Sequence, residues 1–428
     1  MTNNIKVLLL AAGKSTRFWP LSDKNLLPFF GKPLITRQIE KIQKVGFKEI
    51  YLIVNKENFN ETKKYCDNCI IQNGEGLGAA VISGLESMEG PVIIVNSDDI
   101  FPNELLENAK KFITGKNPKN FLTATRVEKY FPGGYLKLVG NKIKEIIEKP
   151  GEDKMPSQYF KFVLDYFSDC KNIKEELNKL ESKQDYELAL NHLMKNGESF
   201  DLLEFAGKWA SLKYPWHVLD AARIFLEEIN GQQIDKSGAI DKTAIITGPV
   251  IIESNVKIFE HAKIVGPCYI GKNVIIGNNA IVRESVIEEG SVLGFTTDVA
   301  RSYIGKNCWF HSNYIGDSIL EENVGMGAGA NLANLRLDED IIFSFVKGEK
   351  INSQKVKLGS VIGKNVRIGI NASIMPGVKI GKNTFIGGGI TVDKDIEDSL
   401  FCYGETKLIT KPNSKKLSAN RDQFKNKI

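Results

Sequence analysis

The stretch VIGKNVRIGINASIMPGVKIGKNTFIGGGITV, from Val361 to Val392, carries an aliphatic residue at every sixth position, starting at Ile362. Neither an α-helix, with about 3.6 residues per turn, nor a flat strand, with a period of about two, produces such a repeat. A parallel β-helix does, because each short strand turns one aliphatic side chain inward while Gly or Asn occupies the corner. The stretch therefore predicts stacked coils around a continuous aliphatic column.

The same repeat occupies most of the C-terminal half of the chain. Its members are Ile240, Ile246, Ile252, Ile258, Ile264, Ile270, Ile276 and Val282, followed after an interruption by Ile362, Ile368, Ile374, Ile380, Ile386 and Val392. Between these two blocks, residues 284–361 keep fragments such as SYIGKN and NYIGDS. We expect further coils there with inserted loops, which are where sites on solenoid proteins often lie.

The N-terminal half has a different pattern. Up to about residue 228, short apolar runs such as VLLLAAG and PVIIVNSDD alternate with helical patterns such as ITRQIEKIQKVG. This alternation predicts a mainly parallel sheet with helices on both faces, and 428 residues suffice for two cores. The predicted segments are an α/β domain over 1–228, a linker over 229–236, a β-helix over 237–405 and a basic tail over 406–428.

Composition narrows the classes of function. The hydrophobic fraction of 42% and the charged fraction of 25% are typical of a soluble globular protein, and a net charge of +5 is too small to predict a nucleic-acid partner. No apolar run reaches membrane-spanning length and no signal-peptide pattern opens the chain, so we expect no membrane partner and a cytoplasmic location. The six cysteines fit reduced thiols, and the CxxC pair Cys66 and Cys69 lacks the further ligands that a metal site needs.

One segment of the N-terminal half concentrates basic residues around a small-residue loop. LAAGKSTRFWPLSDKNLLPFFGKPLI, from Leu10 to Ile35, follows a predicted buried strand. A small-residue loop that leads into a helix directs several backbone N–H groups at one point and can bind phosphate. The planar guanidinium of Arg17 can donate two parallel hydrogen bonds to phosphate oxygens, and Lys24 and Lys32 add positive charges. For AAGKS alone, an ordinary strand–helix turn with solvated bases is an equally good explanation.

The whole segment resembles the signature of the sugar-1-phosphate nucleotidylyltransferases, which reads L-A-A-G-x-G-T-R, P-L-T, K-x-L-L-P and K-P-[LM]-I. The matching residues are Leu10 to Gly13, Thr16, Arg17, Pro20, Leu21, Lys24, Leu26 to Pro28 and Lys32 to Ile35, while Ser15 replaces the second Gly. Further matches are QNGEGLGAA, VNSDDIF, GGYLKL…EIIEKP and DYELALNHLMKNG. The resemblance spans about 220 residues and implies a Rossmann-like α/β nucleotidyltransferase domain.

This resemblance also implies a reaction and a set of site residues. A sugar phosphate oxygen attacks the α-phosphorus of an NTP, and pyrophosphate leaves. The implied nucleotide-binding residues are Leu10, Ala11, Ala12, Gly13, Arg17, Gln72 and Gly78. Arg17 would hold the leaving pyrophosphate, Lys24 would neutralise charge at the α-phosphate, and Asp98 would bind the Mg²⁺ cofactor. The implied sugar phosphate-binding residues are Gly134, Glu148 and Lys149.

The repeat region resembles the left-handed β-helix acyltransferases, in particular the C-terminal domain of bifunctional N-acetylglucosamine-1-phosphate uridylyltransferase/glucosamine-1-phosphate acetyltransferases. The stretch FHSNYIGDSI matches the pattern H-x-x-Y-[LIV]-G-D and gives His311 and Tyr314. The resemblance implies that His311 accepts a proton from a sugar amine that attacks acetyl-CoA, a task that suits an imidazole. Arg283, Tyr314 and Asn334 complete the implied acetyltransferase site, and a homotrimer is the implied assembly.

Departures from both patterns leave two functions open. In WASLKYPW, Ser211 stands where the family has its second Mg²⁺ ligand and Lys213 replaces a Gly, and a hydroxyl is a poorer Mg²⁺ ligand than a carboxylate. Ala300 and Arg301 stand where the acetyltransferases carry lysines. The first hypothesis is an active enzyme that uses UTP with N-acetylglucosamine 1-phosphate, or UTP or dTTP with glucose 1-phosphate, together with acetyl transfer on the β-helix. The alternative is a nucleotide- or sugar-phosphate-binding protein with degraded catalysis, whose β-helix serves oligomerisation.

Overall fold

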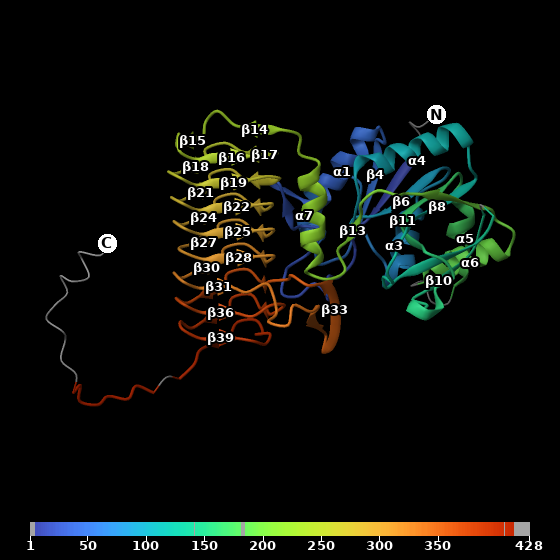
Figure 1. Ribbon diagram of the computed structural model, residues 1–428. Coiled ribbons are helices and arrows are strands. Elements are labelled where there is room, and N and C mark those ends of the chain that lie inside the picture. The colour runs from blue at the N-terminus through green and yellow to red at the C-terminus, as the bar shows by residue number, and fades with distance from the viewer. Residues whose placement is uncertain (1–4, 141, 181–184, 406, 415–428) are drawn as a thin grey trace.

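The computed structural model describes residues 5–140, 142–180, 185–405 and 407–414. The chain forms an α/β domain and a β-helix, which lie side by side (Figure 1). Of the predicted basic tail, residues 407–414 are exposed and form neither helix nor strand, while residue 406 and residues 415–428 lie outside the described residues. Within the described part of the chain, no helix combines the length and apolar character that a membrane span requires.

A nine-stranded mixed sheet forms the centre of the α/β domain, in the order β5-β4-β1-β6-β11-β8-β12-β10-β9. The strands are β1 (Lys6–Leu10), β4 (Glu49–Val54), β5 (Cys69–Ile71), β6 (Val92–Asn96), β8 (Asn120–Arg126), β9 (Gly134–Val139), β10 (Lys142–Glu148), β11 (Tyr159–Phe167) and β12 (Phe200–Glu204). The strands from β5 to β6 are parallel, as predicted, whereas β11 and the β9–β10 hairpin introduce antiparallel pairs. The prediction of a mainly parallel sheet therefore holds from β5 to β6 and for the β8–β12 pair, and it is wrong for β11 and the β9–β10 hairpin. The two hairpin strands need no crossover helix between them.

Helices cover both faces of this sheet, as the sequence predicts. Alternate residues of β1 point to opposite faces: Val7 and Leu9 belong to one apolar cluster, and Leu8 and Leu10 belong to another. Helices α1 (Leu34–Val45) and α4 (Asn103–Lys116) pack on the first cluster, while α3 (Gly76–Leu85), α5 (Lys171–Lys179) and α6 (Tyr186–Lys195) pack on the second. The remaining helices are α2 (Phe59–Thr62) and α7 (His217–Glu227), with 3₁₀ turns at Lys63–Tyr65 and Glu152–Lys154.

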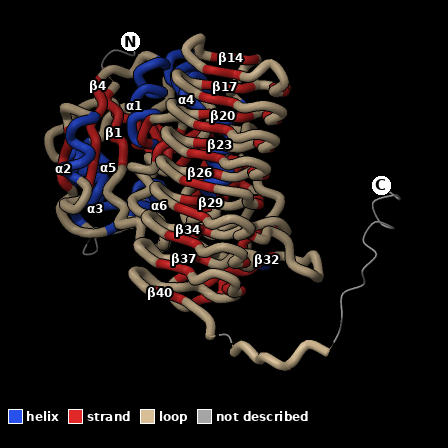
Figure 2. The backbone as a smooth tube through the Cα atoms, turned by 90° about the vertical axis from the view of Figure 1, so that its left-hand side faces the viewer, coloured by secondary structure: helices blue, strands red, loops and turns tan. Residues whose placement is uncertain are grey.

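The left-handed β-helix consists of three parallel sheets, which we call its first, second and third faces (Figure 2). The first face contains β14 (Gln232–Ile234), β17 (Val250–Ile252), β20 (Cys268–Ile270), β23 (Val286–Ile287), β26 (Tyr303–Ile304), β29 (Ile319–Leu320), β34 (Val361–Ile362) and β37 (Lys379–Ile380). The second contains β15 (Ala239–Ile240), β18 (Lys257–Ile258), β21 (Ile275–Ile276), β24 (Val292–Leu293), β27 (Trp309–Phe310), β30 (Gly325–Met326), β35 (Arg367–Ile368), β38 (Phe385–Ile386) and β40 (Phe401–Cys402). The third contains β16 (Ile245–Thr247), β19 (Lys263–Val265), β22 (Ile281–Arg283), β25 (Asp298–Ala300), β28 (Tyr314–Gly316), β31 (Asn331–Leu332), β36 (Ser373–Ile374) and β39 (Thr391–Val392).

The predicted aliphatic positions form the core of this β-helix, and the coils continue through the interrupted region. Ile287, Ile304 and Ile315 extend the buried column, and each stands five rather than six residues after the preceding inward residue. Shorter corners therefore account for the broken phase of the repeat. The inserted loop is a hairpin of β32 (Ile342–Val346) and β33 (Glu349–Lys355). At the other end, β14 lies within the segment predicted as a linker and pairs with β17, so the first coil begins earlier than predicted.

Helix α3 packs so closely on the sheet that it tolerates no side chain at Gly84. A Cβ atom at Gly84 would lie 2.1 Å from Leu8 Cδ1, whereas a Cβ atom at Gly115 in α4 would meet nothing within 4 Å. We expect Gly84→Ala to destabilise the α/β domain by about 1–3 kcal/mol through overpacking. Gly115→Ala, the matched control, should stabilise it by up to about 1 kcal/mol through helix propensity. Denaturant unfolding followed by the fluorescence of the buried Trp216 measures both changes; equal effects would contradict the packing argument.

Candidate functional site

A cavity of about 660 Å³ lies where β1 and β6 end at the same edge of the sheet. Ligands of open α/β sheets bind at the carboxyl ends of the strands. The predicted residues that line this cavity are Leu10, Ala11, Ala12, Gly13, Lys24, Gln72 and Asp98. Asn55, Asn73 and Gly76 line it as well, although the sequence analysis did not single them out. Gly78 is buried inside α3 and does not reach the cavity wall.

Lys24 and Asp98 face each other at the cavity wall. The Lys24 Nζ atom donates a hydrogen bond to Asp98 Oδ2, and the two side chains are 16% and 17% exposed. An ion pair with this little exposure is screened far less than a surface pair. A phosphate group entering the cavity would meet the ammonium and the carboxylate together.

Three polar side chains that the sequence analysis missed hold Lys24 in place. Asn25 is fully buried, and its Nδ2 donates to the Ala11 carbonyl at 3.1 Å. Asp23 accepts the Asn25 backbone N–H through Oδ1 at 2.9 Å and a hydrogen bond from Asn58 Nδ2 through Oδ2 at 2.8 Å. Asn25 occupies the variable position of the K-x-L-L-P match, so the signature itself carried no signal for it.

The departures Ser211 and Lys213 lie beside an acidic pair. Asp99 in β7 (Asp99–Ile100) pairs with Ser211 in β13 (Ala210–Ser211), and the neighbouring Ser211 side chain acts to lower the pKa of the Asp99 carboxyl. Burial, together with the negative charge of Asp98, raises the pKa of Asp99 to about 6. Burial lowers the pKa of Lys213 to about 8, although the charges of Asp99 and Asp98 oppose this shift. Lys213 Nζ donates to the Pro132 carbonyl, so its ammonium lies beside the loop that leads into β9.

The predicted sugar-phosphate residues lie outside this cavity. Gly134 and Glu148 are directly paired across the β9–β10 hairpin, and a Cβ atom at Gly134 would lie 2.5 Å from Glu148 Oε1. The absence of a side chain at Gly134 therefore makes space for the Glu148 side chain. Lys149 follows with its backbone N–H bonded to the Gly133 carbonyl at 3.0 Å. Arg17 is exposed, with its guanidinium 5.9 Å from the centroid of the Tyr214 ring, and does not line the cavity either.

The donor atoms at the cavity wall fit a single Mg²⁺ ion. Among the described residues, no group of three or more His, Cys, Asp or Glu side chains converges as a metal site would require. Asp98 does present one carboxylate to the cavity, and Mg²⁺ is commonly bound by one or two carboxylates while phosphate oxygens and water fill its other positions. The CxxC cysteines Cys66 and Cys69 are free thiols.

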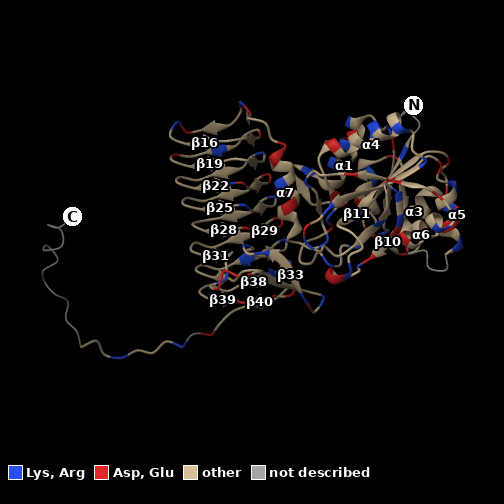
Figure 3. Cartoon of the chain, turned by 45° about the vertical axis from the view of Figure 1, so that its right-hand side comes forward, with Lys and Arg blue, Asp and Glu red and all other residues tan. Residues whose placement is uncertain are grey.

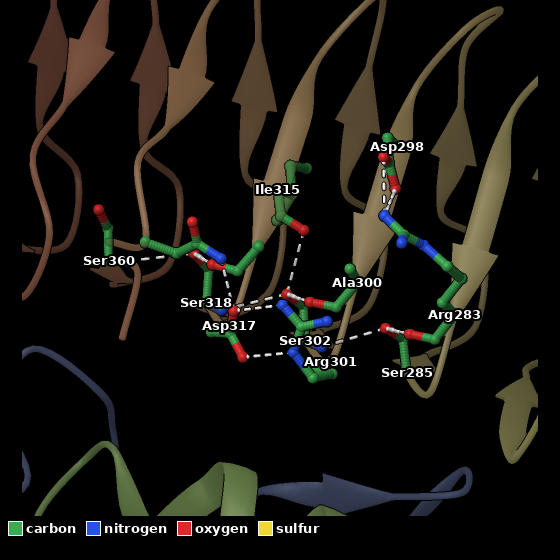
Figure 4. A network of polar contacts seen from close by, with 12 residues as sticks. Arg283, Ser285, Asp298, Ala300, Arg301, Ser302, Ile315, Asp317, Ser318 and Ser360 are labelled. Atoms are coloured by element: carbon green, nitrogen blue, oxygen red, sulfur yellow. Dashed lines mark hydrogen bonds and ion pairs between the residues drawn. The ribbon is translucent and has the colours of Figure 1, made fainter. Parts of the chain in front are cut away.

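On the β-helix, two of the predicted acetyltransferase residues, Arg283 and Tyr314, lie on strands of the third face, and Asn334 follows a strand of the same face. Figure 4 shows Arg283 beside Asp298. Arg283 Nη2 donates to Asp298 Oδ1 and Oδ2 at 2.8 and 2.9 Å. Tyr314 lies on β28, directly opposite Asp298 on β25. Asn334 follows β31 and donates to Asp317 Oδ2 at 2.5 Å. Arg283 and Asn334 therefore each bond to a neighbouring aspartate, next to Tyr314.

Asp317 also binds Arg301, which replaces a lysine of the family pattern. Arg301 donates from Nε and Nη2 to the two Asp317 oxygens, both at 2.7 Å. At the same corner, the hydroxyls of Ser285, Ser302 and Ser318 each accept the backbone N–H of a serine on the next coil, at 3.0–3.1 Å (Figure 4). This serine ladder ties neighbouring coils together beside the candidate site.

His311 lies at the corner between the second and third faces and is exposed. Its backbone N–H donates to Asn313 Oδ1 at 2.8 Å, and its carbonyl accepts from Thr297 Oγ1, so the corner itself is fixed. The other histidines have ordinary structural surroundings. His192 contacts Glu176 at 2.9 Å, His261 is a corner residue with φ of 59°, and burial lowers the pKa of His217 to about 4.

Comparisons with known proteins agree with both halves of this description. Residues 6–210 match the Nucleotidyl transferase family, and residues 249–284 and 359–393 match the Bacterial transferase hexapeptide family. Basic and acidic residues are distributed over both domains (Figure 3), in line with the small net charge.

Relatives match over nearly the whole chain. A "Bifunctional protein GlmU" of Methanococcus vannielii is 34% identical over 94% of this chain and 99% of its own length. A "Bifunctional protein GlmU" of Methanocaldococcus jannaschii is 33% identical over 94% of this chain and 98% of its own length. A "Bifunctional sugar-1-phosphate nucleotidylyltransferase/acetyltransferase" of Sulfurisphaera tokodaii is 33% identical over 94% of this chain and 99% of its own length. The chain therefore belongs to the family of archaeal bifunctional GlmU-type sugar-1-phosphate nucleotidylyltransferases/acetyltransferases.

Proposed function

We propose that the 660 Å³ cavity binds UTP and that the α/β domain, over residues 1–228, transfers its uridylyl group to N-acetylglucosamine 1-phosphate. The observation that carries this proposal is the Lys24–Asp98 pair at the wall of a cavity bordered by the signature segment. UTP or dTTP with glucose 1-phosphate is the second substrate pair. The names of the relatives support a nucleotide sugar as the product.

In this reaction the protein positions the phosphates and stabilises charge. The backbone from Leu10 to Gly13 would bind the nucleotide, and Lys24 would neutralise charge at the α-phosphate. Arg17 would bind the leaving pyrophosphate from the exposed end of the segment. Mg²⁺ held by Asp98 would supply further charge neutralisation at the phosphate oxygens. On the sugar side, Gly134, Glu148 and Lys149 would bind the hexose 1-phosphate.

The role of Asp98 can be tested by removing its charge. We expect Asp98→Asn to lower nucleotidyl transfer by at least about 10²-fold, because the site loses its Mg²⁺ ligand and the partner of Lys24. Pyrophosphate release and Mg²⁺-dependent thermal shift measure the two losses, and the exposed Asp67→Asn should leave both unchanged. Normal turnover in Asp98→Asn would contradict the site. Nucleotide binding by the wild type without pyrophosphate release would favour the degraded binding protein instead.

We further propose that the β-helix unit, over residues 237–405, acetylates an amino sugar phosphate with acetyl-CoA. The amine nitrogen attacks the thioester carbonyl, the C–S bond breaks and coenzyme A leaves as the thiol. Arg283, Tyr314 and Asn334 would hold the sugar phosphate on the third face. His311 would accept the amine proton at the adjacent corner.

Substitution of His311 separates catalysis from assembly. We expect His311→Ala to lower thiol release from acetyl-CoA by about 10²–10⁴-fold, the usual effect of losing a positioned base. The control is His261→Asn, which changes another corner histidine and keeps a residue that tolerates its positive φ. Unchanged thiol release in His311→Ala would exclude the histidine as the base. A wild type that releases no thiol with glucosamine 1-phosphate would leave the β-helix as an assembly unit.

The second face supports a homotrimer. It presents Trp309, Phe385 and Phe401, which are 57%, 52% and 64% exposed, and Ile370 lies exposed at the next corner. Large apolar side chains gathered on one face are typical of a protein–protein interface. A flat face of this kind suits packing around a three-fold axis. The hexapeptide repeat supports an oligomer more generally.

We expect sedimentation at micromolar concentration to give a trimer for the wild type and monomers for Phe385→Glu. The introduced carboxylate would put a charge in place of an apolar ring at the interface, and burying a charge is costly. Val139→Glu is the matched control, because Val139 is an exposed apolar residue of the α/β domain. A monomeric wild type, or a trimer that survives Phe385→Glu, would contradict an interface on the second face.

A further inference from the structure

Two glutamates interrupt a regular pattern on the β-helix. At the corner after each first-face strand from β20 onward, the sequence reads YIGKN, VIEEG, YIGKN, ILEEN, VIGKN and KIGKN in turn. Four coils therefore place Gly at this corner, and the other two place Glu288 and Glu321. These two side chains are 0% and 7% exposed, although nothing about the coil itself requires a carboxylate there.

Both carboxylates accept backbone N–H groups of the α/β domain. Glu321 Oε1 accepts the N–H of Ser22 at 2.9 Å, and Oε2 accepts the N–H of Lys364 at 3.0 Å. Glu288 Oε2 accepts the N–H of Gly31 at 2.8 Å, while its Oε1 is buried without a hydrogen-bond partner among the described residues. Burying a carboxylate is costly, so the bonds that these two make are needed to offset it.

Ser22 and Gly31 lie on either side of Lys24 in the sequence, within the segment that borders the nucleotide cavity. Other contacts attach the same segment to the β-helix. Trp19 Nε1 donates to Asp398 Oδ1 at 2.9 Å, and the Tyr303 hydroxyl donates to the Pro28 carbonyl at 2.7 Å. The Phe30 ring stacks on Tyr269 with centroids 4.4 Å apart. In Figure 1 the segment belongs to the blue chain that reaches from the α/β domain to the β-helix.

A buried apolar cluster also packs the segment against the β-helix, where Phe29 of the segment meets residues such as Tyr303 and Ile319. This packing is interrupted beside the Glu321 anchor. A second cavity, of about 600 Å³, lies between the segment and the β-helix and is bordered by Ser22, Asp23, Tyr303, Glu321 and Lys364. A segment beside such a space has room to shift when an anchor is lost. Lys24 would then leave its position opposite Asp98.

We propose that Glu321 and Glu288 are positioning residues for nucleotidyl transfer, through which the β-helix holds the Lys24 segment of the same chain in its active geometry. The proposal rests on the proposed role of Lys24. It makes the β-helix a supporting part of the first active site, whether or not it also acetylates a substrate. The two glutamates differ in a way that provides a matched experiment.

Glutamine can replace only one of them. Glu321 uses both oxygens as acceptors, so an amide nitrogen in Glu321→Gln would face a backbone donor and one bond would be lost. Glu288 uses one oxygen, so Glu288→Gln can keep its bond to Gly31. Burial raises the pKa of both glutamates, that of Glu288 to about 7.

The test measures pyrophosphate release and hydrogen exchange of residues 19–31 in the full-length chain, with UTP and N-acetylglucosamine 1-phosphate. Glu321→Gln should lower kcat by about 10²-fold, with a smaller change in KM, because misplacing a charged group by about 1 Å costs about that much. Exchange in the segment should rise in parallel. Glu288→Ala removes the acceptor of the Gly31 N–H and should lower kcat and raise exchange in the same direction as Glu321→Gln, whereas the conservative Glu288→Gln keeps that acceptor and should restore both readouts to within about twofold of the wild type. Glu322→Gln, which removes the neighbouring exposed charge, should change neither readout.

Trp19→Phe provides a second variant that leaves the β-helix corners intact. It removes the bond to Asp398 and should lower kcat in the same direction, by a smaller factor. Faster exchange in Glu321→Gln with an unchanged kcat would overturn the proposal, since the contact would then be structural only. If the wild type releases no pyrophosphate, the proposed function fails, and unchanged exchange in Glu321→Gln would overturn the docking independently.

Discussion

The aliphatic column inside the β-helix is the constraint on which the rest of the structure depends. Residues such as Ile264, Ile276 and Ile374 are completely buried, so each coil is fixed by the coils above and below it. The outcome is a regular prism that repeats the same corner at the same place on successive coils. On such a surface Glu288 and Glu321, two coils apart, can meet backbone groups on either side of Lys24.

The segment from Leu10 to Ile35 is held from two sides. On the side of the sheet, the buried Asn25 donates to the Ala11 carbonyl, just after β1, and accepts a hydrogen bond from Ser97, just after β6. On the other side, the corners of the β-helix accept its backbone N–H groups. Functional loops need such support, because the charged side chains of an unsupported loop would occupy many different positions. The two domains are therefore coupled through the segment that both of them touch.

The departures from the family signature concentrate beside the acidic pair Asp98 and Asp99. The Ser211 side chain lies beside Asp99, and the Lys213 ammonium is close to both carboxylates. Of this acidic pair, Asp98 lines the cavity and Asp99 does not. The Mg²⁺ ion proposed for this site would therefore have few protein ligands and would take more of its coordination from phosphate oxygens and water.

The architecture and the position of the cavity at the sheet edge could be predicted from the sequence, because both depend on local patterns. The six-residue repeat predicts β-helix coils, and the strand before Gly13 indicates where the loop at the cavity begins. The shortened corners at Ile287 and Ile304 made the repeat harder to follow in the sequence. The β9–β10 hairpin was not predicted, because its strands pair without a helix between them. Only the tertiary structure decided which residues brace Lys24. The contact between Glu288 and Gly31 joins positions 257 residues apart, and no local periodicity records a hydrogen bond formed when two separately folded surfaces meet.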